Sequence, residues 1–426
     1  MSTTSAAVSR RQTLVTEISL LGALVLLAAL VRFAGRHEMT PDMRIFFVWS
    51  EKLRAAGGFG GLDQEIGNYN APFLYLLALT LYLPGAMVLK IKLVWVIFDA
   101  VLAFFTYRIV ALRRPGWRIP AIAALIMLFL PTVAINASFY GQTDAMWAAF
   151  ALAGVYYLLR NKPWWAVSMC TVALAFKPQG IFIFPLLGLL VLLGQLPWRS
   201  LLAIPAVYLA LDLPAILIGR DPIELLTLYN PGRQAVYAPG LTSNAPSVFA
   251  YLPVSTRIDS LRTIGYVLTA ALILGLYYVF VVRRARLARD QIVTAATVFV
   301  ILMPYFLPGM HERYFYLADV MALVLAFYRP RLWPVPLLVQ AASFLAYEPF
   351  LFGTGPHRPF VSMMILATLL LAALIITTYT LLTDPVERAE PEPEQAAEEK
   401  VEPSLTPPAP LSPPAERKEP LPARQA

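Results

Sequence analysis

The sequence has little cysteine, histidine and charge. It contains one cysteine, Cys170, and three histidines among 426 residues, which excludes an intramolecular disulfide and a cysteine-based metal site. Only 14% of the residues are charged, whereas soluble domains carry roughly 25%. Neither a P-loop nor a dinucleotide-type glycine motif is present, so nucleotide chemistry is not indicated.

Apolar residues make up 58% of the chain and gather in long runs, including 13–31, 119–134, 200–218 and 360–382. These runs approach or reach the roughly 17–25 residues that cross hydrocarbon as a helix. The composition therefore predicts an all-α, polytopic transmembrane helical bundle. The net charge of +8 comes from Lys and Arg dispersed at helix ends, which argues against a nucleic-acid partner.

Basic clusters set the expected orientation, because Lys and Arg of short loops face the cytoplasm. The first run follows Arg10 and Arg11 and has no small-residue cleavage site after it, so we interpret it as a retained span. Placing every basic cluster inside predicts about twelve spans with both termini cytoplasmic. The predicted spans are 13–33, 91–112, 119–136, 145–160, 164–177, 181–197, 200–218, 263–282, 291–307, 314–328, 332–347 and 359–382.

Two parts follow from this topology. Residues 1–383 form the membrane domain, with long outer loops at about 34–90 and 219–262, and residues 384–426 form a disordered, Pro/Glu-rich cytoplasmic tail. If the apolar stretch 72–88 crossed the membrane, the basic cluster at 113–118 would face outwards. We therefore expect this stretch to be an interfacial or re-entrant helix. Short outer loops are expected at 137–144, 178–180, 308–313 and 348–358.

Ionisable and polar residues at span ends are costly to bury, so they are functional candidates. They gather on the outer face: Asp42, Arg44, Gln142, Asp144, Lys177, Gln179, His311, Glu312 and Arg313. Structural roles compete with function at three of them. Asp42 could cap a helix, Asp144 could stabilise a helix start, and Lys177 could extend to the interface.

The chain resembles the bacterial multi-pass relatives of the GPI mannosyltransferases of the PIG-V type, within the GT-C superfamily. The resemblance covers roughly residues 13–382. It rests on an ordered set of short motifs: Asp42 to Trp49, Asn68 to Tyr75, Tyr140 to Asp144, Lys177 to Gln179, Asn244 to Pro246 and His311 to Tyr314. Where the family often has two prolines, this chain has Ala71 and Pro72.

The resemblance implies a glycosyltransferase that moves a hexose, with mannose favoured, from a polyprenyl-phosphate donor to an acceptor hydroxyl with inversion. The active site would face outwards, and Asp42 would be the base. The acceptor stays open between a lipid, a glycan and a protein, and no cofactor is required.

Elementary chemistry gives the other candidate residues compatible roles. Inverting transfer needs a carboxylate to take the acceptor proton and cations to stabilise the departing phosphate. Arg313, His311 and Lys177 suit the phosphate, whereas Gln142 and Asp144 suit sugar hydroxyls. The remaining expected substrate contacts are Arg44, Asn70, Gln179, Asn244 and Glu312, and no metal ligand set is expected.

The alternative is a transporter or flippase of a lipid-linked sugar or related anion. Such a protein should carry charges in mid-membrane and broken helices in symmetric positions. Asp99, Asp212 and Asp319 are the acids near or within spans, and they show no symmetric arrangement. Lys92 and Asp99 could share a helix face at the rim of the site. Tyr229, Gln234 and Tyr237 of the second long loop are secondary candidates.

Overall fold

The computed structural model describes residues 2–234, 236, 240–252, 258–351, 359–385 and 387–388. The chain divides into two compact units, Met1–Glu387 and Arg388–Ala426, and the description below concerns the first. Nearly all of the predicted tail, Tyr237 and most of the loop 348–358 lie outside the described residues.

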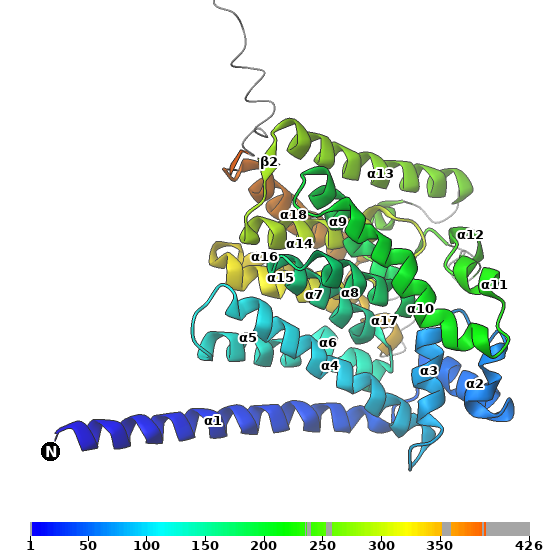
Figure 1. Cartoon of the computed structure of the whole chain (residues 1–426), viewed down its shortest axis with the longest axis horizontal. Helices are drawn as coiled ribbons and strands as arrows, with labels where there is room; N and C mark the ends of the chain where they lie inside the picture. Colours follow the sequence, from blue (N-terminus) through cyan, green and yellow to red (C-terminus); the bar gives the residue numbers. More distant parts are fainter. Residues whose placement is uncertain are drawn as a thin grey trace, which may run out of the picture. The chain divides into compact units, whose positions relative to one another are not determined.

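The described part of the chain is mostly helical (Figure 1). Its α-helices are α1 Ser2–Ala34, α2 Pro41–Ala55, α3 Ala71–Thr80, α4 Met87–Ala111, α5 Arg118–Phe129, α6 Pro131–Ile135, α7 Asp144–Leu159, α8 Pro163–Phe176, α9 Phe184–Leu192, α10 Ala203–Leu217, α11 Pro222–Thr227, α12 Pro231–Gln234, α13 Ile258–Val282, α14 Arg289–Phe306, α15 Tyr316–Tyr328, α16 Pro334–Ala346, α17 Glu348–Leu351 and α18 Met363–Thr383. Short 3₁₀ or π segments are η1 Gly35–His37, η2 Gly58–Asp63, η3 Asn136–Tyr140, η4 Pro178–Ile183, η5 Trp198–Leu202, η6 Val248–Tyr251 and η7 Pro330–Leu332. The strands are β1 Thr242–Ser243, β2 Ala285–Arg286, β3 Met310–His311 and β4 Glu387–Arg388.

Several helices are long and apolar enough to cross a membrane, which confirms the coarse prediction. Among the described residues, four meet the requirement alone: Arg11–His37, Trp198–Leu217, Ile258–Val282 and Met363–Thr383. The most apolar stretch of each is only 6% to 39% buried, so these helices offer broad apolar surfaces to lipid. In Figure 1, α1 runs along one side of the bundle and projects beyond it.

The predicted count of about twelve crossings is not reached by this criterion. The predicted span 119–136 is two helices bent by 55° around Pro131, because proline cannot donate to the helix and clashes with the preceding turn. With this bent pair, the described residues contain up to five candidate spans. The predicted spans 145–160, 164–177 and 314–328 correspond to apolar helices of 10–17 residues.

These shorter helices form the core of the bundle. Nearly all of α7 and α15 is buried, and α7 is rich in alanine, which lets neighbouring backbones approach closely. A side chain at Gly154 of α7 would collide with Cys170 of α8. Cys170 is fully buried and free, as expected for a small core residue.

Three of the predicted basic loops, at 113–118, 283–289 and 329–331, contact the ends of neighbouring helices. Arg114 donates to the carbonyl of Phe327 at 3.2 Å, Arg329 pairs with Asp290 at 2.9 Å, and Arg283 donates to the carbonyl of Leu382 at 2.6 Å. Figure 1 shows α2, α3, α11 and α12 at the opposite end of the same bundle. The separation of basic loops from the predicted outer loops is therefore present in the fold.

Most of the stretch 72–88 belongs to α3, which has only 10 residues and packs against α2, α4, α8 and α10 at the end of the bundle. The hydroxyl of Tyr75 donates to the carbonyl of Leu211 at 2.9 Å and accepts from the amide of Ala215 at 3.1 Å. This helix is therefore too short to cross and too buried to lie along an interface, which favours the re-entrant alternative. Tyr82, just after α3, is exposed.

Candidate functional site

A cavity of about 680 Å³ lies where the predicted outer loops converge. This volume falls within the roughly 300–1,000 Å³ of ordinary ligand sites. Its walls combine α2, the segment 65–69, Gln142, η4, the segment 229–234, the start of α13 and the segment 307–314. Five of the predicted site residues line it: Asp42, Gln142, Gln179, His311 and Arg313.

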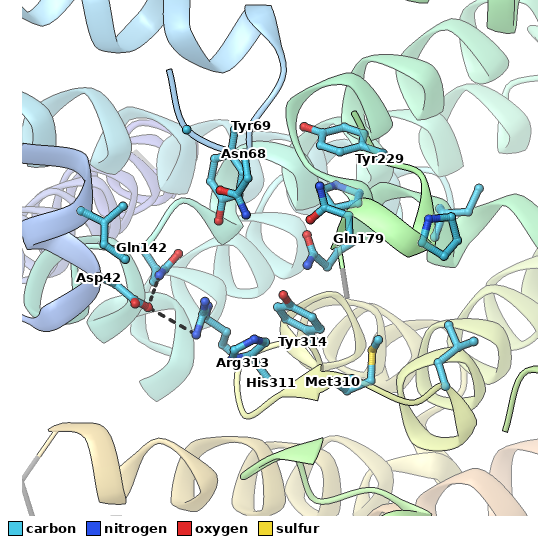
Figure 2. A pocket seen from close by; sticks show the side chains of 18 of the residues that line it. Asp42, Asn68, Tyr69, Gln142, Gln179, Tyr229, Met310, His311, Arg313 and Tyr314 are labelled. Carbon is cyan, nitrogen blue, oxygen red and sulfur yellow. Dashed lines mark hydrogen bonds and ion pairs between the residues drawn. The ribbon is translucent and has the colours of Figure 1, made fainter. Parts of the chain in front are cut away.

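Asp42 projects from the first turn of α2 towards the cavity. The capping alternative does not apply, because Thr40 is the cap and its side chain accepts from the amide of Met43 at 3.1 Å. The Oδ2 atom of Asp42 accepts from Gln142 and lies 3.3 Å from a guanidinium nitrogen of Arg313 (Figure 2). Its Oδ1 atom accepts no hydrogen bond from the described residues, and the side chain is 23% exposed. One carboxylate oxygen is therefore held, and the other is open to the cavity.

A tight turn places Gln142 against α2. Gly141 adopts a left-handed conformation with φ +78°, which glycine adopts without strain. A methyl group at Gly141 would lie 2.9 Å from the sulfur of Met43. The glycine thus permits both the turn and the close approach of the two loops, and Gln142 then reaches Asp42.

Arg313 is the principal cation of the cavity. One terminal nitrogen donates to Glu312 at 2.7 Å, and Glu312 also accepts from the hydroxyl of Tyr140 at 2.8 Å. Burial lowers the pKa of Arg313, but the negative charges of Asp42 and Glu312 outweigh it and raise that pKa well above its usual range. Among the described residues, the buried Nε of Arg313 has no hydrogen-bond partner. The guanidinium lies beside the cavity, with its central carbon 5.8 Å from the ring centre of Tyr140 and 5.7 Å from that of Tyr314.

His311 is a neutral imidazole in this environment. Burial, reinforced by the positive charge of Arg313, lowers the pKa of His311 to about 3. Its Nδ1 lies 3.8 Å from Glu312, beyond hydrogen-bond distance. Near neutral pH this side chain can offer a hydrogen bond to a phosphate but no positive charge, which corrects the expectation of a cation at this position.

Lys177 and Asp144 form a buried ion pair behind the cavity wall. The residue before a proline avoids helical geometry, so α8 ends and Lys177 is extended ahead of Pro178. Its Nζ lies 2.6 Å from Asp144, which also accepts from Trp147 at 3.0 Å and Asn136 at 2.9 Å. Lys177 is 2% exposed, so it does not extend to the interface. The pair also positions Gln142, because Nζ of Lys177 donates to the side-chain oxygen of Gln142 at 3.4 Å.

Aromatic side chains that sequence reasoning did not select complete the cavity. Trp49, Tyr69 and Tyr314 line it together with Tyr229, which had been only a secondary candidate. Burial raises the pKa of Tyr69, so its hydroxyl remains a neutral donor. Tyr69 precedes Asn70 and Tyr314 follows Arg313 in the sequence. Their position next to predicted site residues is the feature that could have identified them.

Six predicted substrate contacts do not line the cavity: Asp144, Lys177 and Glu312 are buried behind its wall, and Asn70, Asn244 and Arg44 lie elsewhere. Asn70 is fully buried. Its side-chain nitrogen donates to Asp212 of α10 at 2.8 Å, and its backbone N–H donates to the hydroxyl of Tyr229 at 3.0 Å. Asn244 takes a left-handed φ of +57° beside β1, which pairs with β3 and ties the second long loop to His311. Arg44 points away from the cavity and is exposed. Asn70 and Asn244 therefore position the walls.

Lys92 and Asp99 of α4 both contact the end of the first span, as two residues on one helix face can, but neither lines the cavity. Asp99 forms a buried ion pair with Arg32 of α1 at 2.6 Å. Lys92 donates to the carbonyls of Gly35 at 2.7 Å and Glu38 at 2.6 Å. Both groups therefore fix the end of the first span.

Within the described ranges, no three His, Cys, Asp or Glu side chains are grouped so that they could hold a metal ion. The comparisons with known proteins found no family model and no curated protein that matches this chain.

Proposed function

We propose that this chain is a membrane glycosyltransferase that moves a hexose, favouring mannose, from a polyprenyl-phosphate donor to an acceptor hydroxyl with inversion. The observation that carries the proposal is one cavity lined by both the carboxylate of Asp42, which is 23% exposed, and the guanidinium of Arg313. A base and an anion-binding group are the two elements that inverting transfer from a phosphate requires.

The chemical step uses both groups. The acceptor hydroxyl gives its proton to Oδ1 of Asp42, and its oxygen forms a bond to the anomeric carbon. The bond from that carbon to the phosphate oxygen breaks, and its electron pair stays on the phosphate. Arg313 and a hydrogen bond from neutral His311 stabilise the departing phosphate.

The apolar part of the cavity suits a lipid-linked donor. Ile181 and Tyr266 line the cavity and are also 38% and 40% exposed, and Tyr266 belongs to α13, a candidate membrane span. A polyprenyl chain can leave the cavity between them and enter hydrocarbon. Gln179 and the surrounding aromatic rings offer a polar contact and flat faces for the sugar.

The proposal includes a topology with about twelve crossings, the cavity outside and both termini inside. The clustering of basic loops at the end opposite the cavity supports this orientation. We expect Asp63→Cys to react with a membrane-impermeant maleimide in intact cells, and Arg331→Cys to react only after permeabilisation. Both positions are exposed, and the native Cys170 is buried, so background labelling should be small. Labelling of Arg331→Cys in intact cells would contradict the orientation.

The linkage of the product tests the reaction type. Purified protein that is given polyprenyl-phosphate-mannose should form a glycoside whose anomeric configuration is opposite to that of the donor, as NMR of the product can show. Retention of configuration would contradict direct attack by an acceptor that Asp42 deprotonates, because retention requires two displacements.

A further inference from the structure

Glu312 is buried behind the cavity wall and holds the guanidinium of Arg313. Its side chain is 0% exposed, and it does not line the cavity. The Oε1 atom accepts from Arg313 at 2.7 Å and from the hydroxyl of Tyr140 at 2.8 Å. Because Tyr140 belongs to η3, Glu312 ties Arg313 to a second element of the bundle. Glu312 therefore fixes where the guanidinium lies.

Negative charge exceeds positive charge in the immediate surroundings of Arg313. Asp42 and Glu312 both lie against this one guanidinium, at 3.3 Å and 2.7 Å. His311 adds no positive charge near neutral pH, because its pKa is lowered to about 3. Lys177 is already paired with another buried carboxylate at 2.6 Å. A phosphate that approaches Arg313 therefore meets two negative charges and one positive charge at close range.

Of these two carboxylates, Glu312 is the costlier one to keep charged. The side chain of Asp42 is 23% exposed, whereas Glu312 is cut off from water, and a buried charge loses its hydration. Burial raises the pKa of Glu312; Arg313 offsets part of this rise, and the charge of Asp42 adds to it. Other charged side chains of the cavity walls act less strongly on this group: Lys52, Glu65 and Arg262.

The second oxygen of Glu312 faces a group that can accept a hydrogen bond from the protonated acid. Among the described residues, Oε2 has no hydrogen-bond partner, and it lies 3.8 Å from Nδ1 of His311. A neutral imidazole accepts at one ring nitrogen and donates at the other. A proton on Oε2 therefore needs only a small approach to reach Nδ1. The ionisable groups around Glu312 are Arg313, His311, Asp42, Tyr140 and Tyr347.

We propose that Glu312 is a positioning residue that takes up one proton when a phosphate binds to Arg313. In the empty cavity its carboxylate holds the guanidinium. In the occupied cavity the neutral acid leaves the charge of Arg313 to the phosphate and donates to Nδ1 of His311. The proton comes from solvent, goes to Oε2, and returns to solvent when the phosphate leaves. This proposal rests on the glycosyltransferase function, because the bound anion is the phosphate of the donor.

The test counts the protons that accompany binding. The full chain in detergent is titrated calorimetrically with farnesyl-phosphate-mannose, a phosphodiester whose single negative charge is constant near neutral pH. Titrations in buffers that differ in enthalpy of ionisation give the number of protons taken up. Between about pH 6 and about pH 9 we expect uptake approaching about one proton, and a dissociation constant that rises by up to about tenfold per pH unit. The rise follows because high pH removes the proton that the occupied site holds.

Three variants locate the proton. Glu312→Gln keeps an acceptor oxygen but carries no charge, so it should bind the probe without proton uptake and with a dissociation constant that does not depend on pH. Glu65→Gln is the matched control, since Glu65 also lines the cavity but is 57% exposed and pairs with Arg233 at 3.0 Å. This control and Asp42→Asn should both take up the proton as the wild type does.

Infrared difference spectroscopy of the wild type provides a measurement that needs no variant. Binding should produce the carbonyl band of a protonated carboxylic acid, and that band should shift in heavy water. Binding without proton uptake at any pH, or uptake that is lost in Asp42→Asn and kept in Glu312→Gln, would overturn the role of Glu312 and leave the glycosyltransferase standing. If the wild type does not bind the probe, the proposed function is overturned together with the role of Glu312.

Discussion

Replacing Asp42 by Asn should reduce sugar transfer about 10²- to 10⁴-fold, which is the usual contribution of a positioned general base. The amide keeps the size of the side chain but cannot take the proton of the acceptor hydroxyl. The loss should appear in the maximal rate, because Arg313 and the aromatic walls still bind the donor. The measurement is the initial rate of transfer by purified protein at saturating donor.

Asp63→Asn is the matched control for this prediction. Asp63 is an exposed carboxylate in the same outer loop, at the end of η2, and it does not line the cavity. The control should transfer at the wild-type rate and should match the other variant in yield and elution volume. Undiminished transfer by Asp42→Asn would remove Asp42 from the role of base.

Replacing Lys177 by Met should destabilise the protein by about 3–5 kcal/mol, because removal of one partner of a buried ion pair leaves an uncompensated charge. Asp144 would keep its contacts with Trp147 and Asn136 but lose a cation at 2.6 Å, and both partners are almost completely buried. The loss should be visible as a lower midpoint of unfolding in detergent, followed by tryptophan fluorescence.

The double variant Lys177→Met with Asp144→Asn separates charge from packing. It should regain part of the lost stability, because it leaves no unpaired charge behind. Arg54→Met removes an exposed pair on α2 and should change the free energy of unfolding by less than about 1 kcal/mol. Equal losses in the single and double variants at Lys177 would show that the ion pair is not what holds this region.

The sequence predicts the helical membrane class and much of the candidate site, because both depend on local signals. Long apolar runs identify the lipid-facing helices α1, α10, α13 and α18. Polar residues at helix ends identify Asp42, Gln142, Gln179 and Arg313, which come together although they are distant in sequence. We expect these residues to converge because placing the basic loops on one side of the membrane leaves the loops that carry these residues on the other.

The remaining features depend on contacts that spacing alone does not reveal. Asn70 belongs to a motif, yet it bonds to Asp212 of α10, a partner 142 positions away. The core helices α7, α8 and α15 have 16, 14 and 13 residues, fewer than a bilayer crossing requires, so their ends are not those that hydropathy predicts for full spans. The neutrality of His311 likewise arises from burial and from Arg313, which is a property of the folded loop.

The most direct test of the central claim is whether the sugar leaves its lipid carrier. Wild-type protein is reconstituted in vesicles with radiolabelled polyprenyl-phosphate-mannose, or the glucose analogue, together with membrane acceptors. The account predicts that the label passes to an acceptor and that an equal amount of polyprenyl phosphate is released. Label that stays on polyprenyl phosphate while it crosses the bilayer would contradict the account and identify a transporter.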